Sequence, residues 1–162
     1  MFAVGDKILY PLHGAGIIEN IEDKEILGKI QKYYVMKLMS TGMSVMIPID
    51  AEEVGLRSII DSKKAMEIIS LFPSLSMPPC RNWNQRYREN MNKLKEGKTI
   101  EVATVVKSLM ERDRKKSLST GERRMLISAK QILVSELMMA TGKTLDEINE
   151  CIDEALKKSI EE

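Results

Sequence analysis

A single tryptophan and the cationic residues around it are the side chains of this sequence best suited to chemistry. Trp83 is the only tryptophan among 162 residues, and Arg81, Arg86 and Arg88 lie within five positions of it. An indole can wedge between base pairs, and guanidinium groups bind phosphate oxygens. Because Trp83 also lies four residues before Tyr87, burial in a helix core is the structural alternative.

The charge distribution points to the same part of the chain. Residues 81–130 contain 14 basic and 6 acidic residues, although the whole chain has a net charge of only +1. A basic block of this kind predicts a polyanionic partner, while simple solvation of helix faces is the alternative. Four further candidates for phosphate binding lie within the block: Lys115, Lys116, Arg123 and Arg124.

The places of these cations on the expected helices differ. Lys115 and Lys116 fall at the C-terminal end of a helix, where positive charge offsets the helix dipole. Arg86 and Arg88 fall near the start of another helix, where acidic residues are preferred. We therefore expect an external anion, such as DNA phosphate, to bind these two arginines.

No pattern in the sequence predicts catalysis. His13 is the only histidine and lies in a glycine-rich turn, and there is no P-loop, no Rossmann glycine pattern and no His/Cys metal spacing. We expect a protein that is not an enzyme and needs no cofactor, metal or small-molecule substrate.

The expected location is the cytoplasm. Cys80 and Cys151 form no CxxC pair, which suits a reducing compartment. The longest uncharged run, residues 68–80, is too short to cross a bilayer, and the first residues lack the pattern of a secretory signal.

The first half of the chain has the pattern of short strands. They are expected at residues 7–12, 16–26, 32–39 and 44–49, with glycine-containing turns between them. This pattern predicts a small, strongly bent sheet or partial barrel. Pro48 cannot donate to a strand ladder, so its strand should lie at an edge or end there.

The second half has helical periodicity. Ser62 is expected to cap a short helix that buries Met66, Ile69 and Phe72, before a proline-rich junction at residues 73–79. Four longer helices follow, with predicted caps at Asn82, Ser119 and Thr144 and stops at Gly97 and Gly142.

The predicted fold is therefore α+β, with three parts. Residues 1–60 form the small sheet, residues 61–80 the short helix and the proline-rich junction, and residues 81–162 an all-helical bundle. Apolar stripes along the four helices predict that the bundle folds without the first half.

Two sets of motifs resemble a known family. The first contains Val4-Gly5-Asp6, Tyr10-Pro11-x-His13-Gly14-x-Gly16 and Val54-Gly55-Leu56-Arg57, and the second Asn82-Trp83-x-x-Arg86-Tyr87 and Leu118-Ser119-x-Gly121-Glu122. They resemble the CarD/CdnL transcription regulators, whose N-terminal domain is shared with transcription-repair coupling factors. Because helicase motifs are missing, the chain resembles the stand-alone regulators.

The resemblance implies a Tudor-like domain that binds the β subunit of bacterial RNA polymerase. It also implies a helical domain that contacts promoter DNA without sequence specificity at the upstream edge of the bubble. There the family's tryptophan wedges into the minor groove and stabilises the open complex. Trp83 falls on this tryptophan, and Arg86 and Arg88 fall on basic positions near it.

On the polymerase side, the resemblance places contacts at Lys24, Met46 and Pro48. Some family members have arginine where this chain has Met46, so the contact should be more apolar here. Gln85 likewise replaces a common basic residue. The predicted function is global regulation of transcription initiation by a monomer that needs no membrane.

Two alternatives stay open. A sequence-specific regulator would place one of the helices in the major groove and bind a defined site without polymerase. A protein adaptor would use its bundle to bind another helix and would show no dependence on DNA.

Overall fold

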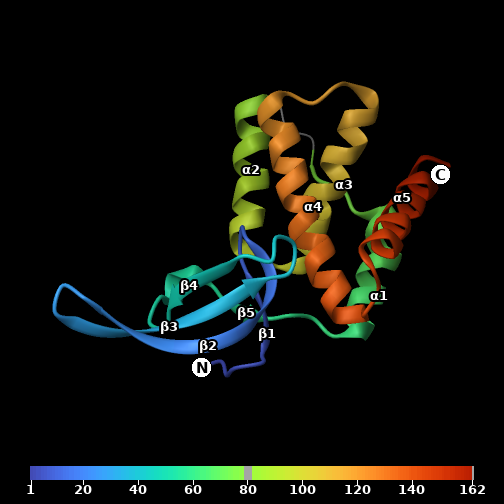
Figure 1. Ribbon diagram of the computed structural model, residues 1–162. Helices are drawn as coiled ribbons and strands as arrows, with labels where there is room; N and C mark the ends of the chain where they lie inside the picture. Colours follow the sequence, from blue (N-terminus) through green and yellow to red (C-terminus); the bar gives the residue numbers. More distant parts are fainter. Residues whose placement is uncertain (79–81, 162) are drawn as a thin grey trace.

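The N-terminal part of the protein is a five-stranded antiparallel sheet (Figure 1). The computed structural model describes residues 1–78 and 82–161, so the predicted DNA contact at Arg81 lies outside the described residues. The strands are β1 (Lys7–Tyr10), β2 (Gly14–Ile26), β3 (Lys29–Leu38), β4 (Ser44–Pro48) and β5 (Arg57–Ser58). Their order is β4-β3-β2-β1-β5, which leaves the sheet open. The predicted bent sheet is confirmed.

Strands β2 and β3 form a long hairpin that extends away from the helices (Figure 1). A register shift between Ile18 and Asn20 interrupts their ladder, and such bulges increase strand twist. Leu27 and Gly28 turn the chain with positive φ angles of 52° and 79°. The Leu27 side chain at this tip is 98% exposed.

Strand β4 pairs with β3 alone among the described residues and ends at Pro48. This confirms the prediction that the strand with the proline lies at an edge. Pro48 lacks an N–H group, so ending the strand there leaves no missing bond within the sheet.

One face of the sheet carries a small core of its own. Alternate residues of the strands point to this face because side chains alternate along a strand. The buried residues are Ile8, Ile18, Tyr34, Met36, Leu38 and Ile47.

Five α-helices follow the sheet: α1 (Ser62–Leu71), α2 (Trp83–Glu96), α3 (Thr99–Lys115), α4 (Thr120–Thr141) and α5 (Leu145–Glu161). Two short 3₁₀ turns are η1 (Glu52–Val54) and η2 (Phe72–Ser74). None of the described helices has the length and apolar character that a membrane crossing requires.

The predicted helix ends agree with the structure from α2 onward. Asn82, Ser119 and Thr144 each accept a hydrogen bond from a backbone N–H in the first turn of α2, α4 and α5. Gly97 and Gly142 follow α2 and α4 in the left-handed conformation, with φ angles of 75° and 76°. These local signals act within four residues, so sequence alone is enough to place them.

Helix α1 differs from its prediction in two respects. Its N-cap is Asp61, whose carboxylate accepts from the Lys64 N–H, and not Ser62. Its buried residues are Ala65 and Ile68, whereas Met66 is 44% exposed. The helix packs on α3, α4 and α5. Phe72, which is 2% exposed, and Ile69, which packs against the same core, agree with the prediction.

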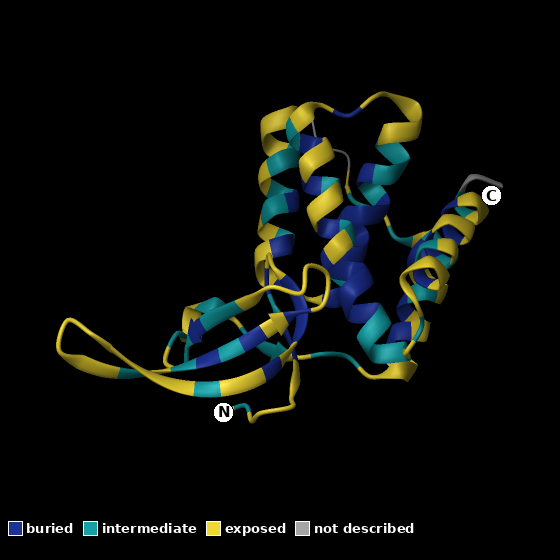
Figure 2. Cartoon of the chain, viewed as in Figure 1, coloured by how far each residue is buried: buried dark blue, intermediate teal, exposed yellow. Residues whose placement is uncertain are grey.

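The larger core joins the two halves of the protein. Leu9 of β1 and Ala15 of β2 belong to the same buried cluster as the inner residues of α3 and α4. Figure 2 shows buried segments on both α3 and α4, in contrast to the exposed outer half of the β2–β3 hairpin. The helical layer therefore packs against the sheet through one shared core.

Candidate nucleic-acid interface

The Trp83 ring lies at the start of α2, at the end of the helical layer that is remote from the sheet (Figure 1). Trp83 is 41% exposed. One face of its ring stacks on Tyr87, with ring centroids 5.0 Å apart and an angle of 22° between the planes. The ring is therefore fixed by its neighbours without being sealed in the core.

A second contact fixes the indole from α4. The Trp83 Nε1–H donates to Ser119 Oγ at 2.9 Å, and the same oxygen accepts from the Glu122 N–H at 3.2 Å. A Cβ atom at Gly121 would lie 3.4 Å from the Trp83 ring, so the first turn of α4 is within van der Waals range of the indole. The N-termini of α2 and α4 thus meet at the indole, and both favour a nearby negative charge.

Arg86 has a partner inside the protein. Its Nε and Nη2 atoms donate to the two Glu122 carboxylate oxygens at 2.9 and 3.1 Å. The Glu122 side chain is only 3% exposed, and Arg112 Nε lies 3.8 Å from it. The premise that Arg86 lacks an internal anion is wrong. The capping pattern Ser119-x-x-Glu122 was the only sequence signal for this carboxylate.

The bound arginines change the acidity of Glu122. The hydrogen bond from Arg86 lowers the pKa of Glu122 below its ordinary value, and the charges of Arg86 and Arg112 add to this effect. Burial acts in the opposite direction but does not outweigh them. Glu122 is therefore an ionised buried anion that holds two arginines at the start of α4.

We predict an acid-sensitive fold from this pKa. The unfolded chain takes up a proton at the ordinary carboxyl pKa, whereas folded Glu122 resists protonation to lower pH. Its contribution to stability is therefore present above the ordinary pKa and is lost as pH falls through the lowered folded pKa. Urea denaturation over a pH series should show a steeper acid loss for the wild type than for Glu122→Gln. Parallel profiles would contradict this prediction.

The other predicted cations lie near the same end of the helical layer. Arg88 is exposed on α2, Arg123 and Arg124 are exposed in the first turns of α4, and Lys115 and Lys116 are exposed at the end of α3. Arg123 makes one loose ion pair, with Asp113 at 3.9 Å. Exposed cations can bind phosphate at little cost, because the ion pairs that they make at the surface are weak.

A groove of about 400 Å³ connects part of this surface. Arg86, Arg112, Lys115 and Lys116 line it together with the segment at Met77 and Pro78. Glu111, the one acid among the described residues that line it, binds the buried Lys107 at 2.7 Å. The groove is therefore cationic overall. Its lining includes Arg112, which the sequence analysis did not predict as a DNA contact.

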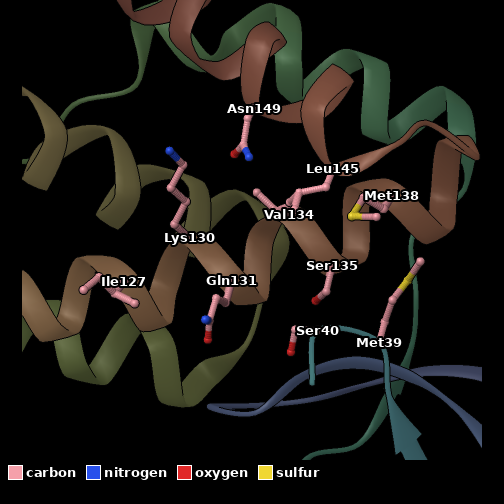
Figure 3. Close-up of a pocket in the computed structure, with 10 residues that line it drawn as sticks. All are labelled: Met39, Ser40, Ile127, Lys130, Gln131, Val134, Ser135, Met138, Leu145 and Asn149. Atoms are coloured by element: carbon pink, nitrogen blue, oxygen red, sulfur yellow. The ribbon is translucent and has the colours of Figure 1, made fainter. Parts of the chain in front are cut away.

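A second hollow lies between the β3–β4 loop, α4 and α5 (Figure 3). It has a volume of about 370 Å³ and shares no lining residue with the cationic groove. Its walls are mainly apolar and include Met39, Ile127, Val134, Met138 and Leu145. Leu145 is 52% exposed here. It occupies the first position of the helix, before the turn that packs on α4.

The three predicted polymerase contacts share one face of the sheet. In the strand ladder Pro48 pairs with Tyr33 and Lys24 pairs with Gln31. Residues 31 and 33 point to the same side of β3, and Met46 points to the same side as Pro48. Lys24, Met46 and Pro48 therefore lie on the face opposite the small core. Lys24 is exposed and the other two are half-buried.

Both halves of the chain match known protein families. Residues 2–60 match the family model "CarD-like/TRCF RID domain", and residues 60–153 match "CarD, C-terminal domain". The chain is 40% identical over 149 residues to "Putative transcription factor YdeB" of Bacillus subtilis (strain 168), which covers 91% of this chain and 97% of that protein. The resemblance seen in the motifs is confirmed: the chain belongs to the CarD family of transcription factors.

Proposed function

We propose that this protein binds the β subunit of RNA polymerase through its sheet. It then stabilises the promoter open complex through the end of the helical layer that carries Trp83. The observation that best supports this proposal is the partly exposed Trp83 ring, which Tyr87 and Ser119 hold in place beside exposed cations. An aromatic plane of this kind suits a base step that is already opening, and the cations suit the phosphates beside it. Neither contact requires a particular base sequence.

The sheet supplies the anchor. Strand β4 pairs on one side only among the described residues and carries Met46 and Pro48, so an extended segment of the polymerase can pair with its other edge by β-augmentation. Lys24 lies further along the same face, on the β2–β3 hairpin, and adds a positive charge to the contact. The protein acts as a monomer in this scheme because one copy contains both surfaces.

Because the sheet anchors the protein to the polymerase, weak DNA binding by the helical layer is sufficient to stabilise the open complex. Once the sheet is bound, the helical end meets DNA at an effective concentration of roughly millimolar. Stabilising the open complex by about 1.4 kcal/mol shifts its ratio to the closed complex tenfold. A stacked ring and a few phosphate contacts can supply this energy.

The direct test is the lifetime of open complexes formed by the cognate polymerase, with and without the protein. A longer lifetime on several unrelated promoters supports the proposal. Footprinting of the free protein is the companion measurement, because a defined DNA site bound without polymerase would favour a sequence-specific regulator instead.

We predict that Arg88→Ala and Arg124→Ala reduce the salt dependence of DNA binding. Each lost phosphate contact should lower the slope of log affinity against log salt by about 0.9 for duplex DNA. Both side chains are exposed, so the fold should be unaffected. The matched control is Lys157→Ala, an exposed cation on α5. A slope equal to that of the wild type would remove the substituted arginine from the interface.

We predict that Lys24→Glu and Pro48→Arg in the full chain abolish capture by immobilised RNA polymerase. Lys24→Glu reverses a charge on the proposed docking face, and Pro48→Arg adds a bulky cation to it. Lys32→Glu is the matched control, since Lys32 is exposed on the same hairpin but points to the opposite face. Equal capture by all three variants would place the docking surface elsewhere.

A further inference from the structure

An ion-pair network connects the sheet to the helices where β5 meets α3 and α4. The guanidinium group of Arg57, on β5, donates to both Glu136 oxygens of α4 at 2.6 and 2.8 Å. Its Nε and Nη2 atoms also donate to the Gly97 carbonyl at 3.0 and 2.7 Å. One side chain thus ties an edge strand to two separate points of the helical layer.

The Glu136 carboxylate is fully used. Glu136 is 1% exposed, and besides Arg57 it accepts from the Thr99 hydroxyl at 2.7 Å and from the Ile60 N–H at 3.1 Å. Charge-assisted bonds of this length are strong and directional, so the four donors fix where α4 stands on the sheet. A buried ion pair is weak evidence for stability, and its best-attested role is to specify one arrangement.

A neighbouring contact connects a second strand, β2, to α4. The Ala15 N–H of β2 donates to Ser135 Oγ of α4 at 3.0 Å, and both groups are buried. Gly14 has a φ angle of +115°, and a Cβ atom there would lie 3.2 Å from Ser135 Oγ. The backbone of β2 approaches α4 this closely because glycine precedes Ala15.

Because α4 is long, the Arg57–Glu136 network near its C-terminus affects the position of the Trp83 ring at its N-terminus. Ser119, which holds the Trp83 ring, caps the N-terminus of α4, and Glu136 lies in its last turns. At 1.5 Å per residue these two positions are about 25 Å apart along the helix. A tilt of about 5° at the sheet would therefore move the indole by about 2 Å, by the geometry of a straight helix.

From this geometry we propose that Arg57 and Glu136 are positioning residues. They set the angle between the polymerase-binding sheet and the Trp83 ring, so that the anchored protein presents the ring to DNA in one orientation. The inference rests on the proposed function, since the angle matters only if both surfaces are used together. The two surfaces then act as one rigid unit.

The test separates orientation from folding and from docking. Spin labels at Lys29→Cys and Ser128→Cys, in a background with Cys80→Ser and Cys151→Ser, report the distance between hairpin and helical layer in the full chain. Arg57→Lys keeps the charge but loses the planar fork. It should at least double the width of the distance distribution and shorten the open-complex lifetime at least threefold. Polymerase affinity should stay within twofold of the wild type.

Two further variants complete the design. Thr99→Val removes one donor to Glu136 with little change in shape and should give a smaller change in the same direction. Lys64→Ala, which breaks the exposed Lys64–Glu67 pair on α1, is the control and should change neither measurement. The milder variant provides the readout if Arg57→Lys fails to fold.

Unchanged distance distributions and lifetimes in Arg57→Lys and Thr99→Val would overturn the positioning role. A broad distribution with an unchanged lifetime would overturn it as well, because orientation would then not matter. A wild-type protein without effect on the lifetime would refute the proposed function instead. The distance measurement would still show whether the network fixes the angle.

Discussion

Replacing Trp83 with alanine should shorten the open-complex lifetime that this protein supports by about 5-fold to 150-fold, the range expected for one lost base–aromatic stack. The affinity for RNA polymerase should not change, because Trp83 lies at the opposite end of the helical layer from the sheet. The measurement is the decay of preformed open complexes after addition of a DNA competitor, together with polymerase capture by the same variant.

Trp83→Phe is the matched control for this result. It keeps an aromatic plane that can stack on Tyr87 but removes the N–H group that donates to Ser119. We expect a lifetime between those of the wild type and the alanine variant. If Trp83→Ala supports wild-type lifetimes on several promoters, the ring has no part in the mechanism, and the exposed cations alone must act on DNA.

Replacing Glu122 with glutamine should lower the free energy of unfolding by about 3–5 kcal/mol, because it removes the carboxylate from a largely buried ion pair with Arg86. For a protein of this size, that loss lowers Tm by roughly 6–20 °C. Thermal unfolding followed by circular dichroism measures the change directly.

Glu67→Gln is the matched control for the stability measurement. Glu67 forms an ion pair with Lys64 on the surface of α1, where both side chains are more than half exposed. Such pairs contribute about 0–1 kcal/mol, so Tm should hardly move. An equal effect of the two substitutions would mean that the Glu122–Arg86 pair is no more important than a surface pair.

The sequence predicted the elements whose signals are local. Asn82 and Ser119 cap helices through bonds that span three residues, and Gly97 ends α2 through its own backbone conformation. Short apolar runs separated by glycine-containing turns likewise predicted strands β1 to β4. Where two capping residues stood side by side, as at Asp61 and Ser62, the local signal did not distinguish them.

The sequence could not predict contacts between distant residues. The environment of Trp83 depends on Ser119, 36 positions away, so spacing relative to Tyr87 could not decide between a buried and an exposed ring. The internal anion of Arg86 is equally distant. The Arg57–Glu136 pair joins residues 79 positions apart and has no local pattern at all.

The length of α4 has a consequence for where the protein acts on a promoter. The stretch from Glu136 to Ser119, about 25 Å by helix rise, corresponds to about seven base pairs of duplex DNA. Under the proposed mechanism, the sheet is bound to the polymerase, and α4 holds the DNA contact at a fixed distance from the polymerase-binding site. The position contacted is then chosen by the enzyme's own placement, and every promoter is touched at the same distance from it, whatever bases lie there.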